Sequence, residues 1–441
     1  MDYKQRRKEE KRQARKKRRM RNQILAYLVL LILILALAGA IVVAVKQIVS
    51  ESQRQQNAQE DSQEKIDGML GDEEDIVVPT PTPEPPVEMT QEQKLDEIVN
   101  AGIEVMPLED KVASLFIVTP ESLTGVNTAV QAGEGTKNAL SQYAVGGFVY
   151  FSKNIQSEAQ ITEMLKNTAA YAKYPMFLAV DEEGGTVARV AGAGIGPKVD
   201  GAQAIGQTGV ADNAHTAGVT IGTSLSGLGF NLDFAPVADI ASVEDSYMMQ
   251  RSYGTDAATA SPFVVSMMQG LQEQNVSACL KHFPGNGATT QDAHTGRAIS
   301  SRTAEEFRAE EFVVFKAGID AGADMVMVSH MIAPGLTGEG DYTPCSLSET
   351  VVTEILRKEL GFDGVIITDA MNMGAITEYY TSADASIYAL KAGCDMILMP
   401  ENFEEAYNGV LQAVKDGTIS EERINDSLRR IYRIKYADRL E

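Results

Sequence analysis

The sequence contains little of several residue types on which whole classes of protein depend. Its 441 residues include no Trp, only three Cys and only four His. So few cysteines exclude a small disulfide-stapled fold, and we expect no disulfide among Cys279, Cys345 and Cys394. Neither a CxxC nor an HExxH pattern occurs, so the sequence predicts no metal site, and we expect no other cofactor.

Positive charge is also scarce and unevenly placed. The chain has 39 Lys and Arg against 61 Asp and Glu, and this net charge of −22 argues against nucleic acid as a partner. Twelve of the basic residues lie within residues 1–22, just before the uncharged apolar run Ile24–Val45. A helix of this length spans the ~30 Å hydrocarbon core of a bilayer. The basic flank places the N-terminal side in the cytoplasm.

We therefore expect a basic cytoplasmic tail over residues 1–22 and a single transmembrane signal-anchor helix over residues 23–46 in the cell membrane. The rest of the chain would then be extracellular. A cleaved signal peptide is the alternative, but the apolar run continues beyond its Ala-Leu-Ala sequence, which favours a retained anchor. Residues 47–93 have few large apolar residues and end in the proline-rich stretch Pro79–Pro86, so we expect a disordered linker there.

In residues 94–441 short β-branched runs alternate with amphipathic stretches of helical length, a pattern typical of βαβ units and a parallel sheet. The expected strands are Ser114–Val118, Gly147–Phe151, Met176–Asp181, Phe230–Pro236, Ala278–Phe283, Met325–His330, Gly364–Asp369 and Met396–Pro400. Eight such units in one domain favour an α/β fold, a closed (β/α)8 TIM-type barrel, over an open doubly wound sheet. No GxGxxG or GxxxxGK[ST] motif follows the first strand, which weakens dinucleotide-binding and P-loop alternatives.

Ionisable side chains stand where several of these strands end. Asp181, Lys281, His330 and Asp369 each close a buried apolar run. Such residues are costly to bury unless the strand ends open into a polar cleft. In a barrel the carboxyl ends of the strands carry the catalytic groups. The sequence therefore predicts a shared site there, although each residue alone is compatible with a structural ion pair or a core histidine.

Four stretches carry a resemblance to a known family: Asp181–Arg189, Arg251–Gly254, Lys281–Gly287 with its continuation to His294, and Thr368–Ala375. In this order and spacing they resemble the barrel domain of the family 3 glycoside hydrolases, and within it the β-N-acetylglucosaminidase branch. The resemblance implies the TIM-type barrel already expected from the strand pattern. It also implies a retaining hydrolysis of β-linked N-acetylglucosamine.

The resemblance assigns the catalytic roles to Asp369, His294 and Asp292. A retaining glycosidase needs a nucleophilic carboxylate and an acid/base close to the anomeric carbon. Asp369 at a strand end suits the nucleophile, with a helix N-cap as the alternative. The family branch uses a loop His as acid/base and an Asp two residues before it, which correspond to His294 and Asp292. An imidazole, which titrates near pH ~6.5, can donate and later accept the proton. The chain ends soon after the barrel, so we expect no second domain to supply a carboxylate acid.

For sugar binding the resemblance implies five residues, matched one by one: Asp181, Arg189, Arg251, Lys281 and His282. Two positions depart from the family pattern. Asn286 replaces a His in the Lys-His-Phe-Pro-Gly-His-Gly motif, and Thr186 replaces an Arg after the paired glycines. His330 is either a pocket residue or a core histidine, and His215 is expected to be structural.

These observations predict a membrane-anchored, monomeric, extracellular exo-β-N-acetylglucosaminidase that acts through a covalent glycosyl-enzyme. The expected substrates are peptidoglycan fragments, glycans or muropeptides, with terminal N-acetylglucosamine. Phosphorolysis of β-N-acetylglucosaminides and another β-glycosidase activity of the same family remain alternatives. A non-catalytic wall-glycan-binding protein is a further one.

Overall fold

The computed structural model describes residues 89–437, which form a closed barrel of eight parallel strands. The order around the barrel is β1-β10-β9-β8-β7-β6-β3-β2. The strands are β1 Phe116–Val118, β2 Gly147–Val149, β3 Phe177–Val180, β6 Leu232–Asp233, β7 Ser277–Phe283, β8 Met325–Val328, β9 Val365–Ala370 and β10 Met396–Leu398. Each overlaps one of the eight predicted runs, with β7 beginning one residue before its run and β9 ending one residue after, and the predicted barrel is confirmed. The predicted tail and anchor (1–46), and the predicted linker up to residue 88, lie outside the described residues.

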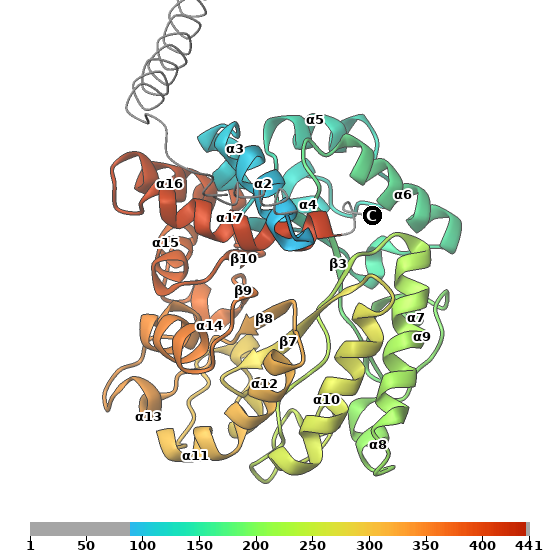
Figure 1. Ribbon diagram of the computed structural model, residues 1–441, viewed down its shortest axis with the longest axis vertical. Helices are drawn as coiled ribbons and strands as arrows, with labels where there is room; N and C mark the ends of the chain where they lie inside the picture. Colours follow the sequence, from blue (N-terminus) through green and yellow to red (C-terminus); the bar gives the residue numbers. More distant parts are fainter. Residues whose placement is uncertain (1–88, 438–441) are drawn as a thin grey trace, which may run out of the picture. The chain divides into compact units, whose positions relative to one another are not determined.

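Helices surround the strands, as Figure 1 shows. They are α2 Gln91–Glu104, α3 Leu108–Ala113, α4 Pro120–Thr124, α5 Glu134–Gln142, α6 Glu158–Tyr171, α7 Arg189–Gly192, α8 Ala202–Gly206, α9 Asp212–Leu228, α10 Ala257–Gln272, α11 Ala304–Ala309, α12 Glu311–Asp320, α13 Pro334–Thr337, α14 Gly374–Thr377, α15 Ser382–Ala392, α16 Phe403–Lys415 and α17 Glu421–Tyr436. A π-helix, η6, spans Thr350–Glu359. Short 3-10 turns are η1 Ser152–Asn154, η2 Met249–Arg251, η3 Asn286–Ala288, η4 Ala293–Thr295 and η5 Cys345–Leu347.

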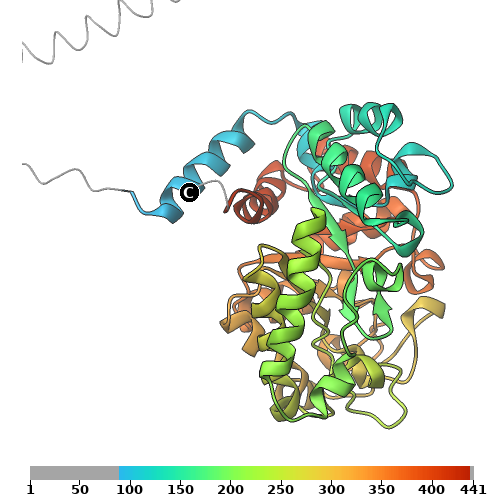
Figure 2. The ribbon, with the colours of Figure 1, turned by 90° about the vertical axis from the view of Figure 1, so that its right-hand side faces the viewer.

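Helix α2 begins at Gln91, inside the last residues of the predicted linker, because Thr90 and Gln93 form a capping box. It packs on α17, so the first and last described helices lie side by side (Figure 2). Arg433 joins the two helices through an ion pair with Asp96 at 3.1 Å.

The three cysteines are unpaired and buried. Cys279 lies within β7, and Cys394 lies just before β10, where small apolar side chains fit between strand and helix. Within residues 89–437, none of the helices is both long and apolar enough to cross a bilayer.

Helices α9 and α10 approach each other closely because glycines lie at their contact. A Cβ at Gly218 of α9 would collide with the carbonyl oxygen of Met267 in α10, and one at Gly270 with the carbonyl of His215. Protein interiors are close-packed, so an added methyl group has to push the two helices apart.

We predict that Gly218→Ala lowers the free energy of unfolding by about 1–3 kcal/mol, the usual cost of overpacking. Gly227→Ala is the matched control in the same helix, because its Cβ would meet open space. That variant should be neutral or slightly more stable, since Ala has the higher helix propensity. Denaturant unfolding of both variants measures the difference, and equal stabilities would contradict the close approach.

Candidate active site

The carboxyl ends of the strands surround a cavity of about 360 Å³. Its charged and polar lining comes from β7, β9 and the segments that follow β3, β6 and β9: Asp181, Glu183, Arg189, Arg251, Lys281, His282, Asp369 and Asn372. All five predicted sugar-binding residues and the predicted nucleophile thus line a single cavity. Nearby apolar side chains, among them Phe151, Phe234 and Met327, provide surfaces for the non-polar faces of a ligand.

A buried ammonium group organises this cavity. Lys281 on β7 is 2% exposed, and its Nζ lies 2.8 Å from Asp181 Oδ1 and 2.7 Å from Glu183 Oε1. Glu183 also accepts two hydrogen bonds from Arg251, at 2.8 Å from Nε and 2.6 Å from Nη2. Paired charges with this geometry satisfy each other in a site where an isolated charge would be costly.

The electrostatics keep Glu183 and Lys281 ionised. Burial alone would raise the pKa of Glu183, but Lys281 and Arg251 outweigh it and lower the pKa to about 2. Burial alone would lower the pKa of Lys281, but Asp181 and Glu183 raise it above its ordinary value. The cavity therefore offers fixed charges of both signs to a ligand across the neutral pH range.

Arg189 is held by the acidic stretch that follows β3. The strands β4 (Glu182–Gly184) and β5 (Val187–Ala188) form a small antiparallel hairpin, and Arg189 begins α7 directly after it. The Glu182 carboxylate accepts the first backbone N–H groups of α7, from Val190 at 2.6 Å. The Arg189 guanidinium lies 3.6 Å from Asp181 Oδ2 and 5.5 Å from the centre of the Phe151 ring.

Asp239 orients the His282 side chain through a hydrogen bond. It is 1% exposed, and its Oδ2 lies 2.7 Å from His282 Nδ1. Because a carboxylate only accepts, Nδ1 carries the proton toward Asp239, and Nε2 is left for the cavity side. The other oxygen, Oδ1, accepts the backbone N–H groups of His282 at 3.2 Å and Asn286 at 2.6 Å.

Asp369 closes β9 and is 8% exposed. Its Oδ1 accepts the backbone N–H of Ala370 at 2.8 Å. The alternative role as a helix N-cap does not apply, because Met373 occupies the N-cap position of α14. His330 lies under this strand end, buried, with Nε2 3.0 Å from the Ala370 carbonyl and Nδ1 2.7 Å from Ser346 Oγ. It is a core histidine that supports the end of β9 and does not line the cavity.

The loop after β7 carries Asp292 and His294, with His294 in the turn η4. Asp292 is partly buried, while the His294 side chain lies outside what the structure describes. Asp292 and Asp369 both raise the pKa of Tyr247, after the larger effects of burial and of Asp239. The charges of the loop carboxylate Asp292 and of the predicted nucleophile Asp369 thus both act on this phenol.

Asn286, one of the two departures from the family pattern, anchors the base of this loop. Its side-chain Oδ1 accepts a hydrogen bond from Ser329 Oγ, and its backbone is held by Asp239. The neighbouring Gly287 packs against the carbonyl of Ile240 so closely that a Cβ would collide with it. Asn286 is thus a structural residue at the base of the loop and is 4% exposed.

The sequence reasoning did not single out Glu183 and Asp239, which position the site, nor the partly buried Tyr247. Glu183 stands within the acidic motif, and Asp239 follows the run Phe230–Pro236, so the strand-end rule extended by three residues finds it. No sequence signal marks Tyr247. His215, expected to be structural, lies on the surface in an ion pair with Glu273 at 3.0 Å.

We predict that Glu183→Gln lowers the free energy of unfolding by about 3–5 kcal/mol at neutral pH, because it leaves two buried cations undercompensated. The pKa of Glu183 is lower in the folded than in the unfolded chain. Its stabilising contribution is therefore complete above the ordinary value of 4.5 and is lost as the pH falls to about 2.

Denaturant unfolding between pH 2 and 7 measures this effect. The difference between wild type and Glu183→Gln should shrink as the pH falls from about 4.5 to about 2. Glu404→Gln, on the exposed face of α16, is the control and should match the wild type throughout. A difference that is constant with pH would contradict the charge pairing.

Comparison with known proteins agrees with this arrangement. The sequence profile of the glycosyl hydrolase family 3 N-terminal domain matches residues 107–434. Beta-hexosaminidase A of Pseudoalteromonas piscicida is 30% identical over 323 residues, which cover 67% of this chain and 54% of that protein. The beta-hexosaminidase of Stenotrophomonas maltophilia strain K279a is 34% identical over 281 residues, 62% of this chain and 81% of that one.

Among solved structures, the family 3 β-N-acetylglucosaminidase from Paenibacillus sp. FPU-7 superposes with a TM-score of 0.69 at 31% identity. The match covers 76% of this chain and 63% of that chain. The chain spans about half the length of the first curated relatives that it matches. The profile covers most of the sequence and all eight barrel strands, so the chain belongs to glycosyl hydrolase family 3.

Proposed function

We propose that this protein is a retaining exo-β-N-acetylglucosaminidase that releases terminal β-linked N-acetylglucosamine. One observation carries the proposal: Asp369 and the charged network around Lys281 line the same cavity at the carboxyl ends of the strands. Its relatives at 30–34% identity are beta-hexosaminidases and a β-N-acetylglucosaminidase, and these activities support N-acetylglucosamine as the sugar.

In the proposed reaction Asp369 attacks the anomeric carbon and the glycosidic C–O bond breaks, which gives a covalent glycosyl-enzyme. His294 donates a proton to the departing oxygen, so the leaving group departs as an alcohol. His294 then takes a proton from water, which attacks the same carbon and releases Asp369. Two inversions at one carbon retain the β configuration.

Several other charged residues have a part in this proposal. Asp292 orients the imidazole of His294 and stabilises its protonated form. Asp181, Lys281 and Arg251 hold the sugar hydroxyls through charge-assisted hydrogen bonds. These bonds fix the anomeric carbon next to Asp369, and such positioning lowers the barrier of the first step.

We also propose that the barrel domain works outside the cell on peptidoglycan fragments, held by the membrane anchor over residues 23–46. The basic flank of residues 1–22 and the apolar run Ile24–Val45 support this topology. An extracellular enzyme for terminal N-acetylglucosamine meets that sugar in wall glycan. The proposal predicts that a protease added to intact cells removes the barrel domain.

The nucleophile is tested with aryl β-N-acetylglucosaminide. We predict that Asp369→Ala lowers kcat/KM by about 10³-fold or more, because removal of one member of a catalytic unit abolishes most of the acceleration. Release of nitrophenol measures the rate, with aryl β-glucoside as the competing substrate. Asp363→Ala removes an exposed carboxylate just before the same strand, at its other end, and as the matched control should keep the activity.

The outcomes separate the alternatives. Stimulation by phosphate with formation of sugar 1-phosphate would show that the reaction is phosphorolysis and not hydrolysis. Preference for the aryl β-glucoside would show that the enzyme has another β-glycosidase activity of the same family. A folded wild-type protein that binds N-acetylglucosamine but turns over neither substrate would indicate a glycan-binding protein.

The acid/base is tested through the leaving group. We predict that His294→Ala lowers kcat/KM by about 10²–10⁴-fold for a substrate with an alcohol leaving group. The loss should be much smaller for a dinitrophenyl leaving group, which departs without protonation. His215→Ala, a surface histidine, should leave both rates unchanged. Equal losses with both leaving groups would exclude His294 as the proton donor.

A further inference from the structure

Residues 289–299 of the loop after β7, here called the acid/base segment, include Asp292 and His294. The segment is closed on itself, because the backbone N–H of Ile299 donates to Gln291 Oε1 at 3.0 Å. Where the imidazole lies relative to the predicted nucleophile therefore depends on the contacts that hold the segment as a whole.

Two neighbouring loops lie against the acid/base segment. In the loop after β8, the Ile332 N–H donates to the Ala298 carbonyl at 2.7 Å, and the Ser300 N–H donates to the Ile332 carbonyl at 2.9 Å. The loop after β9 supplies α14, which lies against η4, the turn that includes His294. The hydrogen bonds fix residues 298–300, beyond His294, so the turn itself depends on its packing with the loop after β9.

The Arg297 side chain joins the acid/base segment to both of these loops. Its guanidinium carbon lies 3.9 Å from the centre of the Tyr379 ring, which follows α14, and 5.9 Å from the centre of the Tyr342 ring, which follows α13. A planar guanidinium stacks on an aromatic face through electrostatic and dispersion attraction. The shorter distance makes Tyr379 the principal contact.

Both rings stand on backbone that is held by hydrogen bonds. The Tyr379 N–H donates to the Ile376 carbonyl at 2.9 Å. The Thr343 N–H donates to Asp341 Oδ1 at 2.8 Å in the turn that carries Tyr342. The two tyrosines are 47% and 52% exposed, respectively, so their rings are accessible to a side chain of the segment. The guanidinium therefore meets two surfaces that are already in place.

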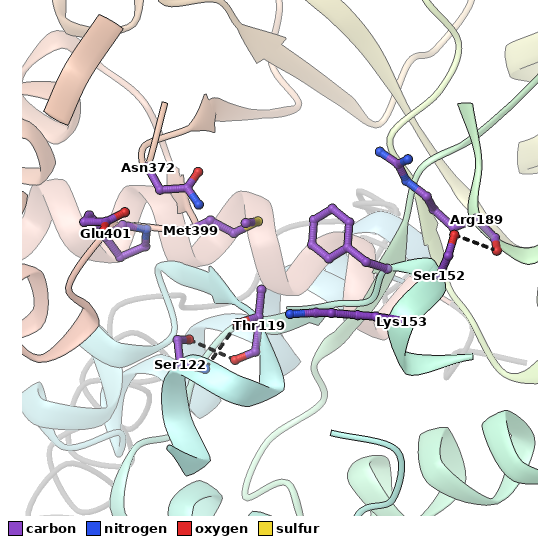
Figure 3. Close-up of a pocket in the computed structure, with 10 residues that line it drawn as sticks. Thr119, Ser122, Ser152, Lys153, Arg189, Asn372, Met399 and Glu401 are labelled. Atoms are coloured by element: carbon purple, nitrogen blue, oxygen red, sulfur yellow. Dashed lines mark hydrogen bonds between the residues drawn. The ribbon is translucent and has the colours of Figure 1, made fainter. Parts of the chain in front are cut away.

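The loop after β9 also borders the candidate active site. It begins after Asp369, and its residue Asn372 lines a cavity of about 560 Å³ on the side opposite Arg189 (Figure 3). Asn372 also lines the cavity that contains Asp369. A contact at Tyr379 therefore attaches the acid/base segment to the same loop that follows the predicted nucleophile.

We propose that Arg297 is a positioning residue, which holds His294 at the cavity through its contacts with Tyr379 and Tyr342. Arg297 takes no part in the bond changes. It acts through the acid/base segment, whose held position lets the imidazole reach the departing oxygen. This inference rests on the proposed function, because it concerns the proton donor of that reaction.

The leaving group tests this role in the full-length chain in detergent. We expect Arg297→Met to lower kcat/KM about 5-fold for the disaccharide of two β-1,4-linked N-acetylglucosamines, whose leaving sugar needs a proton. This is the loss expected for one exposed cation–π contact. The value for the dinitrophenyl glycoside should stay within about twofold, because that group departs without protonation. Equal losses with both substrates, or no loss with either, would overturn the inference.

The aromatic partner is tested in the same assay. Tyr379→Phe keeps the ring face and should retain the wild-type values, whereas Tyr379→Leu should lose about as much as Arg297→Met. The double variant should lose no more than Arg297→Met alone, because both changes remove one shared contact. Tyr388→Leu removes a ring of similar exposure (46%) on α15 and, as the matched control, should match the wild type. Additive losses, or equal losses in Tyr379→Phe and Tyr379→Leu, would contradict the contact.

Hydrogen exchange separates a failure of this inference from a failure of the proposed function. Amide exchange in residues 289–299, measured by mass spectrometry without substrate, should be about 5-fold faster in Arg297→Met than in the wild type. Tyr388→Leu should leave it unchanged. Faster exchange supports the contact even if the wild type hydrolyses neither substrate. Unchanged exchange in Arg297→Met overturns it, even if the wild type is active.

Discussion

The ammonium group of Lys281 is the point on which the site depends. It lies at the centre of the barrel mouth, almost without solvent, between the carboxylates of Asp181 and Glu183. These three residues come from β7 and from the chain directly after β3, and Arg251 joins through Glu183. A buried charge of this kind is stable only with its partners in place. The same contacts that satisfy Lys281 therefore fix the relative position of three loops, and with them the shape of the sugar cavity.

The barrel could be predicted from sequence because its strands are buried on both faces. Such strands appear as short continuous apolar runs, and the eight runs coincide with the eight strands. The hairpin of β4 and β5 could not be predicted in this way. Its residues, such as Glu182 and Thr186, have no apolar alternation, and the hairpin forms because Glu182 accepts the first N–H groups of α7.

Part of the candidate site could also be predicted from the apolar runs that predicted the strands. Asp181, Lys281 and Asp369 end apolar runs, and parallel strands bring such ends together. What the sequence order cannot supply is which side chains meet. Glu183 and Arg251 are 68 residues apart and form an ion pair with two hydrogen bonds. The role of Asn286 could not be predicted either, because its partner Ser329 lies just after β8, the next strand around the barrel.

The loop after β7 is fastened at its base and again near its far end, where the Ala298 carbonyl accepts the backbone N–H of Ile332 at 2.7 Å. Asn286 and Gly287 fix one end against Asp239 and Ile240, and Ser300 fixes the other through its Oγ, which donates to the Ala288 carbonyl at 3.1 Å. The two ends are thus tied to each other as well as to the barrel. The segment between them, residues 289–299, contains Asp292 and His294, so any insertion or replacement there acts on the proposed acid/base pair. Preference for the leaving group can therefore change only around these two residues, while Lys281 and its partners keep their places.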